Sequence, residues 1–473
     1  MRQFEVWVQL PSGNEVHAGD LEELQQLHGS RKGVRFQYRR EYLQSTGAHR
    51  GAYNLSPDLS FDSYPQETPV HRPMFMAFED AGPDRWGRTI IQAEADARAR
   101  ESASRIRRVD ALDILTLVSD NTRQGGLRFK SGDVWHGPEA SLKDGPVMDW
   151  QSLTTAADAI MRGSSARSDL RRLLDQGSFS AGGARPKTNA LKDGRLVLAK
   201  MPQADDRWDV SLWEAATLEM QRSAGIDVPG FSLHNFGEDK SILFLDRFDR
   251  NGDTRLGYMS GRTIMGLEDH DPSRGSYEEL ALALKRSGAE RRDLDQLFRR
   301  VALTILVNNT DDHMRNFGVV RTRNAWNISP SFDVNPQKSE SSDSTPIIRG
   351  GDRDYRTLGE LLNNRDMYEL TEQQAISAIV DVERATARWS EAGLKYGENA
   401  ENLEFFASMF EGRERDWAQN LSSDAMGKMI DLGEAEKHQP RRGDQGLGKT
   451  AGGGNSGSFA KRRPLDPHGR DLT

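Results

Sequence analysis

Three side chains whose types and spacing could support phosphate chemistry follow one another in the second half of the chain. Asp311 and Asn316 are five residues apart in NNTDDHMRNFGVV, and Asp333 follows in SPSFDVNP. A carboxylate at the first position could accept the proton of a substrate hydroxyl. Carboxylate and amide oxygens at the other two positions are ligands that Mg²⁺ prefers. The spacing therefore predicts catalysis by Asp311 and a metal site at Asn316 and Asp333.

A glycine-rich loop, a lysine and a helical glutamate precede this group. Lys200 ends the apolar stretch LVLAK, and Glu214 follows in WEAATLEM, where it could pair with the lysine. The loop is GGARPK, residues 182–187, in which small residues let the backbone approach phosphate and Lys187 adds a positive charge. The order loop, Lys, Glu, Asp, Asn, Asp is that of protein kinases. Each motif is weak alone, and the combination predicts phosphoryl transfer from ATP.

The same residues also have ordinary structural interpretations. Asn and Asp favour turns, and lysine and glutamate side chains are mostly solvated. Asp312 is interpreted as a loop carboxylate, and His313 as a structural hydrogen-bonding residue rather than an acid or base. Only the ordered set favours function.

The elements that must position these residues form a strand-rich first half and a helical second half. Apolar patterns predict strands over residues 4–10, 34–38, 125–129, 196–200 and 241–245, and helices after the turn at 82–83 and over 109–119, 213–224, 294–306, 371–393 and 401–410. Strand-rich and helical halves indicate an α+β protein with two lobes and a cleft between them.

Composition sets outer limits on the class of protein. The chain has 473 residues, which leaves room for roughly two to four domains. Its net charge of -8 argues against a broad basic surface for nucleic acid, and the lack of cysteine excludes disulfides and thiolate zinc sites. The N-terminus lacks the apolar core of a signal peptide, and the apolar runs are too short to span a membrane. We therefore expect a cytoplasmic protein with no membrane contact.

A second possible phosphate loop, GDQGLGKT at residues 443–450, matches the pattern G-x-x-x-x-G-K-[ST]. A phosphate loop needs a preceding strand and a following helix. EAEKHQPRR before it is no strand, and AGGGNSGS after it is no helix. We interpret the match as fortuitous and predict a disordered, basic, glycine-rich tail over residues 431–473.

Taken together, the motifs resemble the HipA family of bacterial serine/threonine kinases, the toxins of type II toxin–antitoxin systems. AGPDRWGR and GGLRF resemble the family's N-terminal region, GGARPK its phosphate loop, LFLDRFDR its hinge, TDDHMRNF its catalytic loop and SFDV its metal motif. The resemblance implies a two-lobed protein-kinase-like fold that uses ATP and Mg²⁺. It divides the chain into an N-terminal subdomain (1–125), an ATP-binding N-lobe-like region (126–260) and a helical C-lobe (261–430).

The resemblance also assigns the nucleotide site residue by residue. The phosphates would lie against Gly182, Gly183, Ala184, Arg185, Pro186, Lys187 and Lys200. The adenine hinge would comprise Asp246, Arg247 and Phe248, used largely through their backbone. The catalytic base would be Asp311, and His313, Met314, Arg315, Asn316, Phe332 and Asp333 would complete the nucleotide and metal site. Ser180 falls where the family is autophosphorylated, and Ser178 is a second candidate.

The partners are likewise implied by the resemblance. They are a protein substrate, for example an aminoacyl-tRNA synthetase, and a HipB-like helix-turn-helix antitoxin through which DNA would be contacted indirectly. Two alternatives stay open: a catalytically weak binding module that acts as repressor or antidote, and a kinase of a small molecule or lipid. One departure from the family pattern is Asp312, since a small residue is common there.

Overall fold

The described part of the chain ends at residue 421. The computed structural model describes residues 2–24, 33–45, 51–105, 108–137, 139–164, 167–175, 183–237, 240–268, 275–322, 325–338, 346–350 and 356–421. All of them belong to one unit, Met1–Ala425. The predicted tail with GDQGLGKT lies outside the described residues, and the predicted domain boundaries at 125 and 260 remain predictions.

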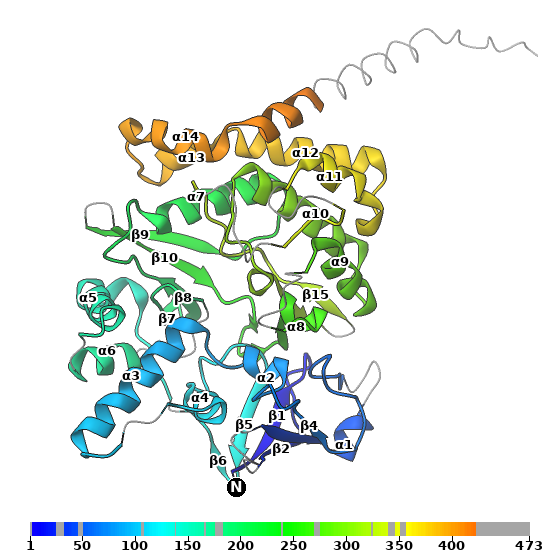
Figure 1. Ribbon diagram of the computed structural model, residues 1–473. Helices are drawn as coiled ribbons and strands as arrows, with labels where there is room; N and C mark the ends of the chain where they lie inside the picture. The colour runs from blue at the N-terminus through cyan, green and yellow to red at the C-terminus, as the bar shows by residue number, and fades with distance from the viewer. Residues whose placement is uncertain are drawn as a thin grey trace, which may run out of the picture. The chain divides into compact units, whose positions relative to one another are not determined.

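The N-terminal strands form a six-stranded antiparallel sheet (Figure 1). Phe4, Val6 and Val8 of its central strand are buried, while the residues between them are exposed or half-buried, as the predicted alternation requires. In spatial order the strands are β4 (Gln66–Glu67), β3 (Val34–Tyr38), β2 (Glu15–Glu23), β1 (Gln3–Gln9), β5 (Leu127–Ser131) and β6 (Val134–Trp135).

The helices of the first half belong to two apolar cores, and α3, α5 and α6 contribute to the one that includes strands of the next sheet. The helix predicted after the turn at 82–83 is α3, and Trp86, Ile90 and Ile91 on it pack into one apolar core with strands of the next sheet. The N-terminal part of the chain is thus packed against the part that follows it. These helices are α1 (Arg40–Leu43), α2 (Met76–Asp80), α3 (Arg85–Glu101), α4 (Ala111–Leu117), α5 (Trp150–Met161) and α6 (Arg167–Asp175).

A four-stranded antiparallel sheet and one long helix form the middle of the chain. The strand order is β7 (Lys187–Lys192), β8 (Arg195–Lys200), β10 (Lys240–Asp246), β9 (Phe231–Gly237). Helix α7 (Val210–Ser223) is nearly all buried, and Asp209 caps its start by accepting a hydrogen bond from the Leu212 N–H. A short 3₁₀ turn, η1 (Gly145–Val147), precedes α5.

The second half is mainly helical, as predicted. Its helices are α8 (Gly261–Met265), α9 (Tyr277–Arg286), α10 (Arg291–Leu306), α11 (Leu358–Asn363), α12 (Glu372–Thr386), α13 (Trp389–Tyr396) and α14 (Leu403–Phe410). Short 3₁₀ turns are η3 (Met314–Asn316), η4 (Arg365–Tyr368) and η5 (Ala400–Asn402). One small sheet pairs β11 (Arg250–Asn251) with β12 (Thr254–Arg255), and another has β14 (Gly318–Arg321) between β13 (Tyr258–Ser260) and β15 (Trp326–Ile328).

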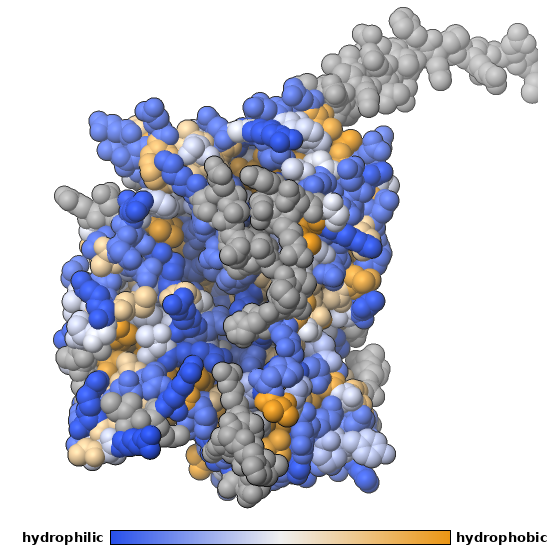
Figure 2. Space-filling model, in the orientation of Figure 1, coloured by the Kyte–Doolittle hydropathy of each residue, from blue (hydrophilic) through white to orange (hydrophobic). Residues whose placement is uncertain are grey.

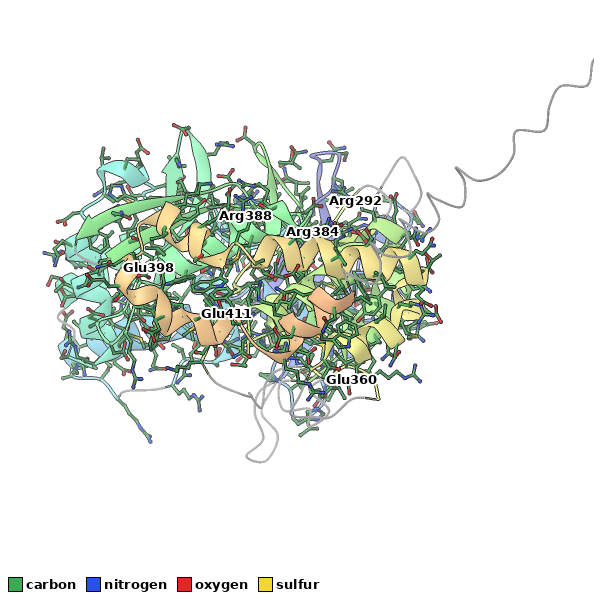
Figure 3. The ribbon with its side chains drawn as sticks, turned by 90° about the horizontal axis from the view of Figure 1, so that it is seen from above. Arg292, Glu360, Arg384, Arg388, Glu398 and Glu411 are labelled. Atoms are coloured by element: carbon green, nitrogen blue, oxygen red, sulfur yellow. The ribbon has the colours of Figure 1, made fainter. Side chains whose placement is uncertain are left out.

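The predicted helix over 371–393 is wrong in one respect, because it is two helices with a break between Thr386 and Trp389. Trp389 stacks on Phe410 with ring centroids 5.0 Å apart, a contact that packs α13 against α14. The outer side of this layer is charged, with Arg384, Arg388 and Glu411 exposed (Figure 3). Tertiary packing of an aromatic residue, which the helical pattern did not reveal, is the physical reason we assign to the break.

The surface agrees with a polar composition. The face seen in Figure 2 is mostly hydrophilic, and its hydrophobic side chains lie in small separate groups. Among the described helices, none is long and apolar enough to cross a membrane.

Candidate active site

The loop after α10 joins Asp311 to Asn316. Asn308 adopts a left-handed backbone conformation (φ +49°), which turns the chain out of the helix. The Nδ2 of Asn316 then donates a hydrogen bond to the carbonyl oxygen of Asp311 at 2.9 Å. Asn316 is buried and Asp311 is exposed. Because this bond uses the amide nitrogen of Asn316, its amide oxygen is the atom that can face a cation.

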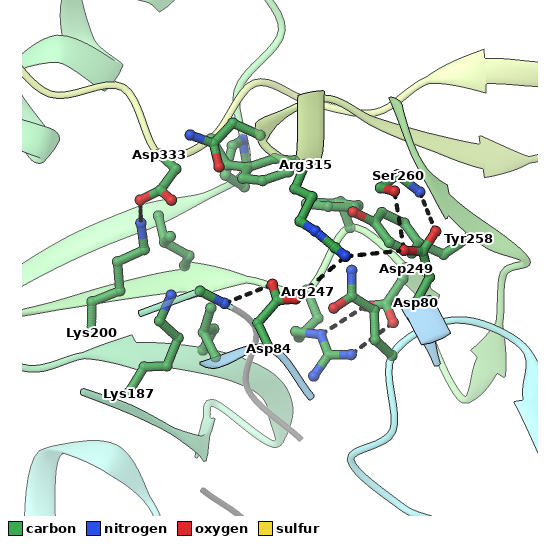
Figure 4. A pocket seen from close by; sticks show the side chains of 18 of the residues that line it. Asp80, Asp84, Lys187, Lys200, Arg247, Asp249, Tyr258, Ser260, Arg315 and Asp333 are labelled. Carbon is green, nitrogen blue, oxygen red and sulfur yellow. Dashed lines mark hydrogen bonds and ion pairs between the residues drawn. The ribbon is translucent and has the colours of Figure 1, made fainter. Parts of the chain in front are cut away.

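A buried lysine links the middle sheet, helix α7 and the predicted metal motif. Lys200 Nζ donates to Glu214 Oε1 at 2.6 Å, to Glu214 Oε2 at 2.8 Å and to Asp333 Oδ1 at 2.6 Å. Figure 4 shows the Lys200–Asp333 contact at the pocket wall. The predicted pairing of Lys200 with Glu214 is confirmed, so these two side chains are not simply solvated.

Burial and ion pairing act in opposite directions on the pKa values of this cluster. Burial disfavours the charged form of Lys200, but Asp333 and Glu214 outweigh it and raise the pKa of the ammonium group. Burial also disfavours ionised Asp333, but Lys200 and Lys187 outweigh it and hold the pKa of that carboxyl well below its usual range. Lys200 is therefore a cation and Asp333 an anion at neutral pH.

Asp333 also has an unusual backbone. Its φ of +62° lies in the left-handed region, which residues other than glycine rarely adopt. Such conformations cost roughly 1–3 kcal/mol and tend to occur at functional sites. The strain at Asp333 thus falls on a residue that the sequence had already selected.

The described part of the glycine-rich loop lies over Lys187. Gly183 has φ +84°, and a side chain there would collide with Lys187 Nζ. Lys187 is buried, which lowers the pKa of its ammonium group. Arg185 turns away to form an ion pair with Asp206. Gly182, Ser178 and Ser180 lie outside the described residues.

The side chain of the hinge residue Arg247 is held by hydrogen bonds to neighbouring residues. Its guanidinium donates two hydrogen bonds of 2.7 Å to Asp249 and further ones to Asn189 Oδ1 (2.8 Å) and the Thr122 carbonyl (3.1 Å). Asp249 also accepts from Arg250 Nη1 at 2.6 Å and from the Gly125 N–H at 2.7 Å. The hinge is therefore fastened to the segment around residues 122–125.

Most of the predicted site residues line one pocket. Phe248 and Phe332 stack there with ring centroids 5.4 Å apart. The predicted residues that line it are Gly183, Lys187, Lys200, Asp246, Arg247, Phe248, His313, Arg315, Asn316, Phe332 and Asp333. Ala184, Arg185, Pro186, Asp311 and Met314 do not line it. Asp311 is thus joined to the pocket through Asn316 rather than as part of its wall.

The two residues after Asp311 differ from their sequence interpretation. Asp312 is buried, accepts a hydrogen bond from the Tyr277 hydroxyl at 2.8 Å and lies 3.9 Å from Arg356 Nη1, so it is an anchor of the loop rather than a loop carboxylate in solvent. Burial raises the pKa of its carboxyl. His313 lines the pocket, and its Nδ1 is buried with no hydrogen-bond partner among the described residues. The expected structural hydrogen bond is not found at that atom.

The donor set fits a Mg²⁺ ion shared with phosphates. Asn316 and Asp333 present hard oxygen atoms to the same pocket, beside the unpartnered Nδ1 of His313. Within the described residues no group of three or more His, Asp or Glu side chains forms a complete cage. Mg²⁺ commonly uses one or two carboxylates together with substrate phosphates, so a full cage is not required.

Sequence reasoning missed a wall of the pocket that comes from the N-terminal part of the chain. Asp80, Gly82 and Asp84 line it, as does Gln124. Gly82 and Asp84 lie within AGPDRWGR, so the motif was noticed but its position was not predicted. The missing information was the tertiary contact, since nothing in the spacing of these residues indicates a shared pocket.

Comparison with known proteins defines the class. Residues 179–389 match the family model of the HipA-like C-terminal domain. A Haemophilus influenzae protein that is provisionally named a kinase is 27% identical over 134 residues, which is 25% of this chain and 39% of that relative. The chain therefore spans about two-fifths of the relative's length. Over residues 179–389 the chain is thus similar to HipA-like C-terminal domains, and part of it is similar to that relative.

Solved structures define the fold. HipA in the Shewanella oneidensis complex of HipA, HipB and operator DNA superposes with a TM-score of 0.55 at 13% identity, covering 90% of this chain and 97% of that one. The Helicobacter pylori kinase CtkA superposes with a TM-score of 0.36 at 15% identity over 51% of this chain and 93% of that one, which is too loose to argue from. The predicted kinase-like α+β fold and the resemblance to HipA are confirmed.

Proposed function

We propose that this protein is a HipA-type serine/threonine kinase that transfers the γ-phosphate of ATP to a protein hydroxyl group. The observation that supports this most is that Lys200, Asn316 and Asp333 line one pocket while Lys200 is paired with the buried Glu214. A lysine paired with a helical glutamate, next to an Asn and an Asp, is the set that protein kinases use for the phosphates and the metal.

ATP would lie with its adenine at the hinge and its phosphates near Lys187 and Lys200. The N–H of Asp246 donates a hydrogen bond of 2.7 Å to the Gly230 carbonyl oxygen, and the N–H of Arg247 donates one of 3.4 Å to the Leu196 carbonyl oxygen. Adenine recognition therefore falls to the carbonyl of Asp246 and the N–H of Phe248. The pocket wall beside them is aromatic, with Phe248 against Phe332.

In the transfer step, the substrate hydroxyl oxygen attacks the γ-phosphorus while its proton passes to the Asp311 carboxylate. The bond from the γ-phosphorus to the bridging oxygen breaks, and ADP leaves. Mg²⁺ bound by Asn316 and Asp333 would offset the charge of the phosphates. Asp311 is exposed, which suits an acceptor that stays outside the pocket, as a protein side chain would.

The substrate and partner follow from the family likeness. The solved HipA is bound to HipB and operator DNA. We accordingly propose a HipB-like helix-turn-helix antitoxin as partner, DNA contact only through it, and a cytoplasmic toxin whose protein substrate is of the aminoacyl-tRNA synthetase class.

We further propose self-inhibition by autophosphorylation at Ser180, with Ser178 as the second candidate. A phosphoserine adds about -1.5 to -2 charge at neutral pH, which beside Lys187 would compete with the ATP phosphates. Mass spectrometry of the wild type beside Asp311→Asn tests this, since phosphate on neither serine, or equal phosphate in both proteins, would contradict it.

The central experiment measures phosphate transfer with labelled ATP for the wild type and Asp311→Asn. The substitution is nearly isosteric but removes the proton-accepting charge, so transfer should fall about 10²–10⁴-fold while ATP still binds. Transfer within about threefold of the wild type would refute the role of Asp311. A wild type that binds ATP without transferring phosphate would support the alternative of a binding module. Labelled phosphate on a lipid or small molecule would support the alternative of a lipid or small-molecule kinase.

A further inference from the structure

Residues of the motif AGPDRWGR, in the N-terminal part of the chain, form hydrogen bonds with the glycine-rich loop. Asp84 Oδ2 accepts a hydrogen bond from the Gly183 N–H at 2.8 Å. The Trp86 N–H donates to the Gly183 carbonyl at 3.0 Å, and Trp86 Nε1 donates to the Lys187 carbonyl at 2.9 Å. Three hydrogen bonds across about 100 positions of sequence thus hold both ends of the described loop segment.

Asp84 also faces the catalytic loop. Its Oδ1 lies 3.6 Å from Arg315 Nη1, and Asp80 Oδ1 lies 3.8 Å from the same nitrogen (Figure 4). Asp80 is held in turn by the N–H and hydroxyl of Ser260, at 2.7 and 3.0 Å. Asp84 therefore contacts both Gly183 and Arg315, two residues that line the pocket.

The behaviour of Asp84 differs from that of an ordinary helix cap. It occupies the N-cap position of α3, but its side chain makes no capping hydrogen bond. Asp110, Asp149 and Asp209 occupy the same position on α4, α5 and α7, and each accepts a hydrogen bond from its own helix. Since an Asp at this position normally caps, the use of the Asp84 carboxylate on a distant loop calls for a separate role.

We propose that Asp84 is a positioning residue of the nucleotide site, which together with Trp86 holds Gly183 over Lys187 and orients Arg315. The proposal rests on the proposed function, because the loop and Arg315 are taken as phosphate-binding groups. Lys187 Nζ lies so close under Gly183 that a displaced loop would uncover the lysine and remove its direction toward the pocket. The affinity for ATP would then depend on a carboxylate outside the HipA-like C-terminal domain.

The test compares the wild type with Asp84→Ala and Asp84→Asn in the full chain. Asp84→Ala loses a charge-assisted hydrogen bond, so the Kd and KM for ATP should rise about tenfold while kcat changes less than about threefold. Asp84→Asn keeps an oxygen acceptor for the Gly183 N–H and should recover part of the loss. Asp149→Ala is the matched control: it removes a capping carboxylate away from the pocket and should leave the KM unchanged.

A second measurement does not depend on nucleotide. Hydrogen exchange of the peptide containing residues 183–187, without ATP, should be about tenfold faster in Asp84→Ala than in the wild type and unchanged in Asp149→Ala. Equal exchange, or an unchanged KM in Asp84→Ala when the wild type binds ATP, would overturn the positioning role. If the wild type does not bind ATP, the proposed function fails, and the exchange experiment still decides whether Asp84 holds the loop.

Discussion

Two buried ion-pair clusters adjoin the pocket, and they are opposite in composition. In one, the cation Lys200 is shared by the carboxylates of Glu214 and Asp333. In the other, the carboxylate of Asp249 is shared by the guanidiniums of Arg247 and Arg250. The side chain of Asp333 is 30% exposed, whereas that of Asp249 is 2% exposed.

The difference indicates which cluster can exchange partners. Asp249 also lines the pocket, but its carboxylate is 2% exposed and already accepts hydrogen bonds from two arginines and a backbone N–H. Asp333 faces the pocket, and Lys200 would keep Glu214 if Asp333 moved to a metal ion. We infer that the Lys200 cluster is built for chemistry and the Asp249 cluster for holding the hinge to residues 122–125.

The largest expected effect is on protein stability, when the Asp249 cluster is broken. Asp249→Ala leaves two buried guanidiniums without their carboxylate counter-charge and the Gly125 N–H without its acceptor, so the free energy of unfolding should fall by about 3–5 kcal/mol. Urea denaturation measures it. Glu67→Ala is the control, because it breaks the exposed pair with Arg35 and should cost less than about 1 kcal/mol. A loss below about 1 kcal/mol for Asp249→Ala would remove the distinction between the clusters.

A substitution in the Lys200 cluster should change activity more than stability. Asp333→Ala removes a metal-binding oxygen and should lower turnover about a hundredfold, measured with labelled ATP across Mg²⁺ concentrations. Asp193→Ala is a matched control, because Asp193 also has a left-handed backbone (φ +52°) but does not line the pocket. Both variants should unfold with similar free energies, and only Asp333→Ala should lose turnover. Unchanged turnover and magnesium requirement would contradict the assignment.

Acid should reduce the contribution of the Asp249 cluster to the free energy of unfolding. The arginines overcome burial and hold the pKa of the Asp249 carboxyl far below its usual range. An unfolded aspartate binds its proton near pH 3.9, so the stabilisation by Asp249 is present above about pH 4 and is lost as pH falls further toward its folded pKa. Urea denaturation from about pH 5 to 3 should show a shallower decline for Asp249→Asn than for the wild type. Parallel curves would count against this.

The last prediction is that removal of the C-terminal tail does not change the affinity for ATP. If all phosphate-binding groups belong to the described pocket, removal of residues 438–473 should leave the ATP Kd unchanged, since GDQGLGKT lacks the strand and helix that a phosphate loop needs. Calorimetry with the full and shortened chains decides this. A shortened chain that no longer binds nucleotide would place the phosphates in the tail instead.

The residues that the structure brings together around Lys200 and Asn316 could be selected from the sequence by their type and order. Lys200, Glu214, Asn316 and Asp333 could be predicted together because each stands at a strand end, on a helix or in a loop that the apolar pattern located. The same patterns located some of the strands and helices, including β1, β8 and α10, but missed others such as β2, β9 and α9.

Residues that act through tertiary contact could not be read in this way. Asp84 accepts from a backbone N–H almost 100 positions away, and any carboxylate in a loop would look the same in the sequence. The burial of Asp312 depends likewise on Tyr277 and Arg356, which approach from other elements. Short-range patterns carry no information on such pairs, so the N-terminal wall of the pocket required the structure.

The left-handed backbone at Asp333 carries a steric cost that a glycine at this position would avoid. Glycine adopts this conformation without steric cost, and Lys200 would still have Glu214 as its partner. The same substitution would also remove the 2.6 Å ion pair with Lys200, so the backbone cost and the ion pair act in opposite directions on stability at this one residue.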